Sequence, residues 1–181
     1  MCMNKLLKAC VLVVLGALSA FSPNTSAGDS EPIIHAVKNF GFKLTAPGSW
    51  KPSESDTAST RLKLSVDASI PNAAVFIVSA VLDPPQNEKD LPFAVKEFRD
   101  RWAKDMPDYV FDKNQDTTIA GKKAVKITFL DKVKGSETKG FFIITARNNK
   151  LYSLSFIATP SIYDDKLPDV QKVVESFKWT D

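Results

Sequence analysis

The stretch AAVFIVSAVL, residues 73–82, decides the fold. Its residues are almost all apolar, and successive side chains of a β-strand point to opposite faces. One face carries Val75, Ile77 and Val81, and the other carries Phe76, Val78, Ala80 and Leu82. A strand that is apolar on both faces is typical of the middle of a sheet that is covered on both sides. We therefore expect a central strand here, with other elements packed on each face.

Alternating apolar and polar residues on either side of this strand predict further strands. The clearest is the stretch 61–66, where Leu62 and Leu64 point one way and basic or polar residues point the other. More strands are expected over residues 40–44, 109–119, 125–129, 141–144 and 152–158. Two tight turns are expected, at Ala120-Gly121 and at Asn148-Asn149, because glycine and asparagine tolerate left-handed conformations.

Apolar residues at intervals of three and four predict two amphipathic helices. The first begins after Asp90, a good N-cap residue, and ends before Pro107. The second is expected over residues 164–177, where Asp164 and Asp165 suit the start of a helix because they complement its dipole. The order is three strands, a helix, four strands and a helix. The predicted fold class is therefore α+β, an antiparallel sheet with segregated helices in one domain.

The first 27 residues are expected to be a secretory signal peptide. Lys5 and Lys8 precede the stretch Ala9 to Phe21, 13 residues without a charge, and small residues close the segment at Ala27. The stretch is shorter than the roughly 20 apolar residues that span a bilayer. We expect cleavage after Ala27, translation from Met1 or Met3, and a periplasmic or secreted product. A lead-in over residues 28–39, helical or extended, would then precede one domain over residues 40–181.

Cleavage would change the composition of the chain. The chain has 24 Lys and Arg against 21 Asp and Glu, and the loss of two lysines would lower its net charge from +3 to +1. That charge is too small to indicate general nucleic-acid binding. Cys2 and Cys10 both lie in the same segment. The exported chain would therefore have no thiol for a disulfide, for catalysis or for a metal site.

Three motifs of this sequence resemble those of a known family. The opening motif is FKLTAPGSW at residues 42–50, and the middle motif is IAGKKA at residues 119–124. The closing motif is YSLSF at residues 152–156, followed by Tyr163 and by VESF at residues 174–177. Together they resemble the PsbP-like superfamily, which includes the photosystem II extrinsic protein and the bacterial DcrB-type exported proteins. The resemblance covers about residues 40–178.

The resemblance implies a fold and a kind of activity. The fold is an antiparallel sheet sandwiched by helices, an α/β/α sandwich, in agreement with the doubly apolar stretch 73–82. The family implies a binding or assembly role, no enzyme activity and no cofactor. Its shared motifs are structural, so it supplies no catalytic, cofactor-binding or metal-binding residue for this chain.

The sequence contains few candidates for catalytic or metal-binding residues. His35 is the single histidine, and any transition-metal site or serine–histidine relay would depend on it alone. A surface or capping role suits it better. The acidic residues near the two predicted helices lack the glycine-bent spacing of a calcium loop. A small envelope hydrolase and a lipid or small-ligand carrier remain as alternatives to a binding protein.

A basic hairpin is the most suggestive surface feature of the sequence. Its lysines are Lys122, Lys123, Lys126, Lys132, Lys134 and Lys139. Such a hairpin could steer an acidic protein or an anionic membrane surface, although exposed lysines also protect sheet edges from aggregation. We expect an unidentified envelope protein as partner, no nucleic acid, and no membrane anchor in the exported chain.

Overall fold

The structure, a computed structural model, describes residues 30–54, 58–66, 74–81, 90–132 and 137–180. The expected signal peptide and its cleavage site therefore lie outside the described residues. In chain order the elements are β1 (Ile33–Val37), the short 3-10 helix η2 (Lys38–Phe40), β2 (Phe42–Ala46), β3 (Lys51–Pro52), β4 (Thr60–Ser65), β5 (Ala74–Val81), α1 (Leu91–Asp105), β6 (Tyr109–Phe111), β7 (Gln115–Ile119), β8 (Lys122–Asp131), β9 (Thr138–Arg147), β10 (Lys150–Ala158), α2 (Pro160–Ser176) and β11 (Lys178–Trp179). None of the helices in these ranges is long and apolar enough to cross a membrane.

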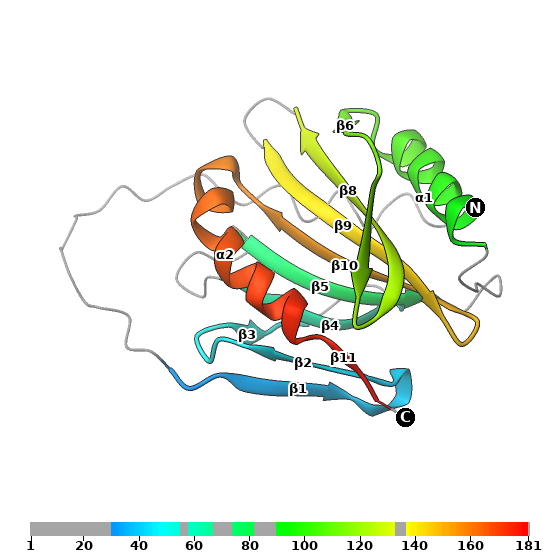
Figure 1. Ribbon diagram of the computed structural model, residues 1–181. Coiled ribbons are helices and arrows are strands. Elements are labelled where there is room, and N and C mark those ends of the chain that lie inside the picture. Colours follow the sequence, from blue (N-terminus) through cyan, green and yellow to red (C-terminus); the bar gives the residue numbers. More distant parts are fainter. Residues whose placement is uncertain (1–29, 55–57, 67–73, 82–89, 133–136, 181) are drawn as a thin grey trace, which may run out of the picture.

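The strands form two antiparallel sheets (Figure 1). The larger, eight-stranded sheet has the order β3-β4-β5-β10-β9-β8-β6, and β7 also pairs with β8. The smaller sheet has the order β1-β2-β11, so it joins strands from the two ends of the chain. The predicted fold class, α+β with an antiparallel sheet and two helices, is confirmed. The prediction of a single sheet is wrong, because the short strands β1 and β11 pair with β2 instead of extending the large sheet.

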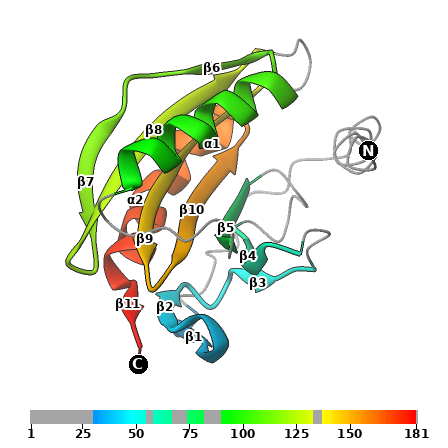
Figure 2. The ribbon, with the colours of Figure 1, turned by 90° about the vertical axis from the view of Figure 1, so that its right-hand side faces the viewer.

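The two helices pack on opposite faces of the large sheet (Figures 1 and 2). Residues of β9 show this most directly, since neighbours along a strand point to opposite faces. Phe141 and Ile143 join the apolar cluster that contains Val170 and Val173 of α2. The alternate residues, Phe142 and Ile144, join the cluster that contains Leu91 and Val95 of α1. The small sheet shares the α2 side, where Phe42 stacks on Phe177 at 5.3 Å between ring centres.

The stretch that decides the fold is central, but its two faces are buried unequally. β5 lies between β4 and β10. Ala74, Phe76, Val78 and Ala80 are fully buried, whereas Val75 and Ile77 on the opposite face are only half-buried. The expectation of full cover on both faces is therefore wrong for β5, because α1 packs over β8 and β9. Ala73 and Leu82 lie outside the described residues.

Several element boundaries differ from those expected. The second helix begins at Pro160, four residues earlier than predicted, so Asp164 and Asp165 lie in its second turn and do not cap it. The expected strand over residues 109–119 is divided into β6 and β7, which both pair with β8. Asp90 occupies the N-cap position of α1, but its side chain makes no capping hydrogen bond. The lead-in is extended, since residues 33–37 form β1 and pair with β2.

The two expected tight turns are confirmed. Ala120 and Gly121 both have positive φ, 46° and 78°. Asn148 and Asn149 have positive φ of 49° and 56°. Two successive left-handed residues are typical of the two-residue turn that matches the twist of a β-hairpin. These turns fix the registers of β7 with β8 and of β9 with β10, and they place the ends of four strands side by side.

Candidate functional site

The described lysines of the basic hairpin do not form one surface. β8 is ten residues long, which corresponds to about 30 Å for an extended strand. Lys122 and Lys123 lie at its start, whereas Lys132 follows its end. Lys134 lies outside the described residues. A single binding surface cannot use both ends of this strand unless its partner also spans that length.

Two of the hairpin lysines contact other parts of the fold. The Nζ of Lys126 lies 4.7 Å from the centre of the Phe141 ring. The Nζ of Lys139 forms an ion pair of 2.8 Å with Asp164 and lies 4.5 Å from the centre of the Tyr163 ring. The Lys126 contact joins β8 to β9, and the Lys139 contacts join the sheet to α2. Lys126 and Lys139 are therefore better explained by packing than by partner binding.

The start of β8 belongs to a larger cluster of basic residues. Because β8 pairs antiparallel with β9, its start lies beside the end of β9. Arg147 ends β9 and pairs with Lys150, the first residue of β10. At the same end of the sheet, Arg61 donates a hydrogen bond of 3.2 Å to the carbonyl of Ala80 in β5. We call this cluster the basic end; it comprises Lys38, Arg61, Lys122, Lys123, Arg147 and Lys150.

Phe40, in η2, contacts two residues of the basic end. The guanidinium carbon of Arg61 is 4.0 Å from the centre of its ring, and the Nζ of Lys150 is 5.5 Å from it. The carbonyl oxygen of Phe40 accepts a hydrogen bond of 2.9 Å from the hydroxyl of Tyr152. Burial raises the pKa of this tyrosine, whereas the nearby charge of Arg147 lowers it. The ring of Phe40 thus contacts Arg61 and Lys150, and its carbonyl oxygen is hydrogen-bonded to Tyr152, so η2 is fixed on the large sheet.

Arg147 connects the basic end to the end of the small sheet. One of its terminal nitrogens donates to the carbonyl oxygens of Gly41 and Thr180, at 3.2 and 3.3 Å. Its guanidinium carbon lies 5.0 Å from the centre of the Trp179 ring. Arg147 is therefore a structural part of the basic end that also contributes its charge.

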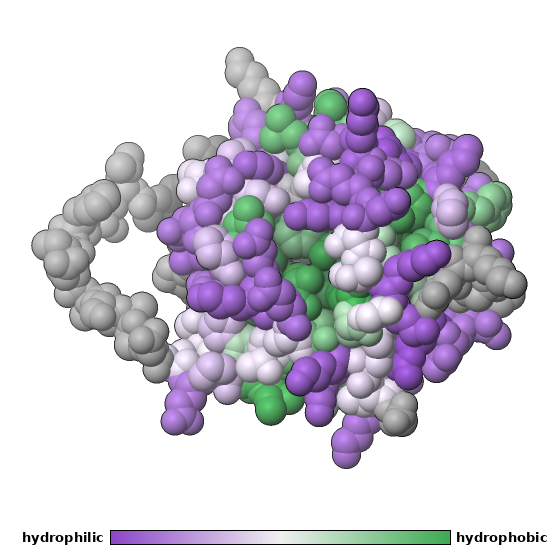
Figure 3. Space-filling model, viewed as in Figure 1, coloured by the Kyte–Doolittle hydropathy of each residue, from purple (hydrophilic) through white to green (hydrophobic). Residues whose placement is uncertain are grey.

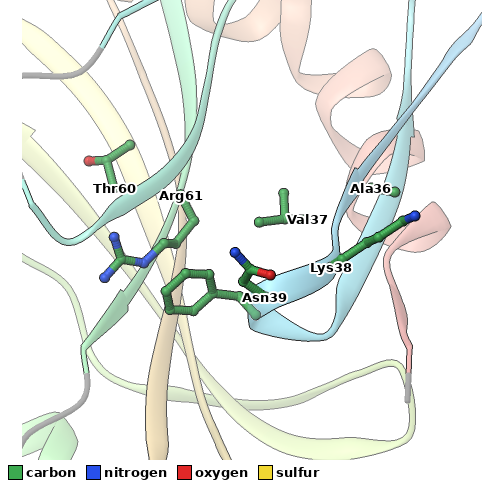
Figure 4. A pocket seen from close by; sticks show the side chains of 7 residues that line it. Ala36, Val37, Lys38, Asn39, Thr60 and Arg61 are labelled. Carbon is green, nitrogen blue, oxygen red and sulfur yellow. The ribbon is translucent and has the colours of Figure 1, made fainter.

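A shallow hollow of about 400 Å³ opens at the basic end (Figure 4). Val37, Asn39 and Phe40 line one side of it, and Thr60 and Arg61 line the other. In Figure 4 the guanidinium of Arg61 is turned toward Thr60 and away from Asn39, while Lys38 extends away from both. The hollow is open and mostly polar, so it can admit an acidic side chain of a partner next to a guanidinium.

The other residues considered from the sequence do not join the basic end into a chemical site. His35 lies in β1 opposite Leu44 and is half-buried. Burial lowers its pKa. Among residues 30–54, 58–66, 74–81, 90–132 and 137–180, no three His, Cys, Asp or Glu side chains come close enough together to hold a metal ion. In this region the basic end is the clearest candidate for binding.

Sequence reasoning found only Lys122 and Lys123 of the basic end. The remaining four residues come from η2, β4 and the turn between β9 and β10. Lys38 and Lys150 each stand beside asparagine, with no run of charges to mark them. The signal that could have found Lys150 and Arg147 was the Asn148-Asn149 turn, because a two-residue turn places its flanking residues opposite each other.

Comparisons with known proteins bear on the fold. No protein-family model matches this sequence, and no curated protein matches it either. Solved structures do match. Cyanobacterial PsbP (CyanoP) from Synechocystis sp. PCC 6803 superimposes with a TM-score of 0.60 at 12% identity, covering 87% of this chain and 98% of that chain.

Two further solved structures are similar. LpqN of Mycobacterium tuberculosis, described as involved in cell envelope biogenesis, has a TM-score of 0.58 at 15% identity, covering 88% of this chain and 90% of its own. A protein of unknown function from Pseudomonas aeruginosa, described as a putative regulator, has a TM-score of 0.50 at 16% identity, covering 81% of this chain and 96% of its own. The chain therefore has a PsbP-like fold, as its motifs indicated. At these identities the likeness establishes the fold alone.

Proposed function

We propose that this chain is an exported, non-enzymatic accessory domain, an α/β/α sandwich of PsbP-like type that binds an acidic surface of another envelope protein through its basic end. The observation that carries the proposal is that Arg61, Lys122, Lys123, Arg147 and Lys150 come from separate strands to one end of the large sheet, with Lys38 on the adjoining η2. A chain with little net charge that gathers basic residues in one place can steer and orient an acidic partner.

Export is supported by two independent observations. The first 27 residues have the order of charge, apolar stretch and small residues that a secretory signal requires. LpqN, which shares the fold, is described as involved in cell envelope biogenesis. An envelope location would also give the basic end access to the partners we propose for it.

A protein partner suits the shape of the basic end. The hollow beside Arg61 is open and lies on a rigid frame, since Phe40 is fixed by Tyr152 and Arg61. A partner that inserts one carboxylate beside Arg61 would place neighbouring acidic groups near Lys150 and Lys123. The lipid-carrier and hydrolase alternatives are separate outcomes of the experiment below.

The test uses two triple variants with the same change in charge. In the first, Lys38→Glu, Lys123→Glu and Lys150→Glu reverse the basic end. In the second, the control, Lys104→Glu, Lys132→Glu and Lys172→Glu reverse exposed lysines elsewhere on the surface. Each immobilised variant is incubated with envelope extract of the source cell at low and high salt, and bound proteins are quantified.

The expected result is one stoichiometric partner that binds the unmodified chain and the control, binds the first variant at least tenfold more weakly, and loses affinity as salt rises. Equal binding by both triple variants would overturn the use of the basic end. Bound lipid in native mass spectrometry, or turnover of an ester or glycan panel, would replace the proposal by a carrier or a hydrolase.

A further inference from the structure

β1 forms an uncovered edge of the small sheet. The order of that sheet, β1-β2-β11, leaves one long side of β1 without a neighbouring strand among the described residues, along the lower margin of Figure 1. Edge strands of this kind offer unpaired N–H and C=O groups to another chain, and proteins commonly blunt them with lysine, proline or a bulge. β1 has the sequence IIHAV and contains none of these.

The backbone groups on the free side of β1 can be assigned from β2. The N–H and C=O of Thr45 both face α2, because the hydroxyl of Ser176 lies within 2.8 and 3.1 Å of them. In an antiparallel pair, the backbone N–H and C=O groups of alternate residues face the partner strand, and those of the residues between them face away from it. Thr45 is opposite Ile34, so the backbone groups of Ile34 also face away from β2. The same holds for Ala36, two residues further along β1. The free edge of β1 therefore presents the N–H and C=O of Ile34 and Ala36.

Two large apolar side chains of β1 are unusually exposed. Ile34 is 68% exposed and Ile33 is 43% exposed. Figure 3 shows apolar surface at the lower margin of the molecule, where Figure 1 places β1. Two exposed isoleucines on an edge strand that contains no lysine, proline or bulge are typical of a surface that pairs with another strand.

We propose that two copies of this chain associate through antiparallel pairing of their β1 strands, with His35 opposite His35. In this register Ile34 and Ala36 of one copy exchange backbone hydrogen bonds with Ala36 and Ile34 of the other. Each exposed Ile34 side chain lies beside a small Ala36, and each Ile33 lies beside a Val37. The two small sheets become one continuous sheet with two-fold symmetry, an isologous interface.

Charge favours a second copy of this chain as the occupant. Glu31 lies two residues before β1, separated from it by Pro32, and Lys38 directly follows β1; the side chains of Glu31 and Lys38 are both exposed. Antiparallel pairing places Glu31 of each copy near Lys38 of the other copy, at both ends of the interface. Between these ends the strand is apolar apart from the central histidine. A strand pair of this size is small, so we expect a dimer that forms reversibly with concentration.

Disulfide trapping tests the register. Two single-cysteine variants, His35→Cys and Ala36→Cys, are made in the full chain carrying Cys2→Ser and Cys10→Ser, which leaves no other cysteine. In the proposed pair, residues 35 of the two copies are directly opposite with Cα atoms about 4.5 Å apart, within disulfide range. Residues 36 are offset by two positions along the strands and lie about 8 Å apart, beyond disulfide range.

The expected result is a covalent dimer of His35→Cys under mild oxidation at micromolar concentration, and at least tenfold less of it for Ala36→Cys. Equal cross-linking of both variants, or of neither, would overturn the proposed register.

Sedimentation of the chain without cysteine substitutions supplies a second measurement. We expect its mean mass to rise toward that of a dimer with concentration. Ala36→Pro removes an N–H that faces away from β2, and edge strands tolerate proline at such positions; it should raise the dissociation constant at least tenfold, whereas the control Ala36→Ser should not. A chain that stays monomeric over the whole range, or an Ala36→Pro variant that dimerises normally with an unchanged melting temperature, would contradict the proposal.

Discussion

The hydroxyl of Ser176, the last residue of α2, lies 2.8 Å from the backbone nitrogen of Thr45 in β2 and 3.1 Å from its carbonyl oxygen. The same hydroxyl lies 2.7 Å from the carbonyl of Val173 in the helix. It accepts from the Thr45 N–H, and its single proton serves the two carbonyls. β11 pairs with β2 only at Phe42 and Lys43, so Ser176 takes the place of a strand where that pairing stops.

Ser176→Ala should destabilise the fold. The substitution leaves the N–H of Thr45 without its acceptor in a partly buried position, which costs about 1–2 kcal/mol. Urea unfolding would measure the change in the free energy of unfolding. Glu175→Ala, at the exposed neighbouring residue, is the control and should have little effect. A Ser176→Ala variant as stable as the unmodified chain would mean that water replaces the hydroxyl fully.

Ala120→Asn should stabilise the hairpin between β7 and β8. Ala120 has a φ of 46°, a left-handed conformation that its Cβ makes unfavourable by roughly 1 kcal/mol. Asparagine followed by glycine is the preferred pair for this turn, and Gly121 is already in place. We expect a gain of up to about 1 kcal/mol in thermal or urea unfolding. The reverse change at the other hairpin, Asn148→Ala, should cost a similar amount; a loss of stability with Ala120→Asn would contradict this account of the turn.

Gly140→Ala should weaken the middle of the large sheet. A Cβ at Gly140 would lie 2.4 Å from the carbonyl oxygen of Phe156 and 2.5 Å from the ring of Phe129. The backbone atom cannot move away without breaking sheet pairing, so we expect a loss of about 1–3 kcal/mol, measured by urea unfolding. Gly121→Ala separates crowding from backbone conformation, because a Cβ there has no neighbour within 4 Å but a φ of 78°. A smaller loss at Gly140 than at Gly121 would show that the sheet can relax around the methyl group.

The parts of the fold that the sequence predicted are those that depend on local patterns. The helix that begins at Leu91, the strand around Phe76 and the Asn148-Asn149 turn each follow from residues within a few positions of one another. The small sheet depends on contacts between distant residues. β11 pairs Lys178 with Lys43, and no local pattern marks a two-residue strand. The small sheet could therefore not be predicted from local sequence patterns.

The candidate site was predictable only in part for the same reason. Lys122 and Lys123 are adjacent in sequence, so a charge pattern reveals them. Arg61 lies at the same end of the sheet as these lysines only because β4, β5, β10, β9 and β8 follow one another in the sheet. The apolar residues Val75 and Ile77 show the opposite difficulty, since their pattern predicts burial but α1 covers other strands. Pattern fixes which residues can be buried, and topology decides which neighbours bury them.

Tyr163 should titrate far above an ordinary tyrosine. Burial, and then the negative charge of Asp164, raise its pKa to about 12. In the unfolded chain it ionises near pH 10, so the folded state holds its proton longer and stability falls as pH rises from about 10 to about 12. Absorbance at 295 nm would follow the titration, and Tyr163→Phe should remove the highest step. Asp164→Asn should lower the pKa, because it removes the charge; an unchanged titration would assign the whole shift to burial.

His35 should make the folded chain less stable in mild acid. Burial lowers its pKa below 6.5 in the folded state, while the unfolded chain keeps a pKa near 6.5. As pH falls below about 6.5, the unfolded state binds a proton first, so the free energy of unfolding falls until the folded state is protonated too. Carboxylates have ordinary pKa values near 4 and His35 is the single histidine of the chain, so we assign the slope between pH 6.5 and 5.5 to His35. Urea unfolding of the dilute chain at pH 7.5, 6.5 and 5.5 would measure that slope. The matched variant His35→Gln should flatten it, and a slope that persists in His35→Gln would show that another group causes the loss.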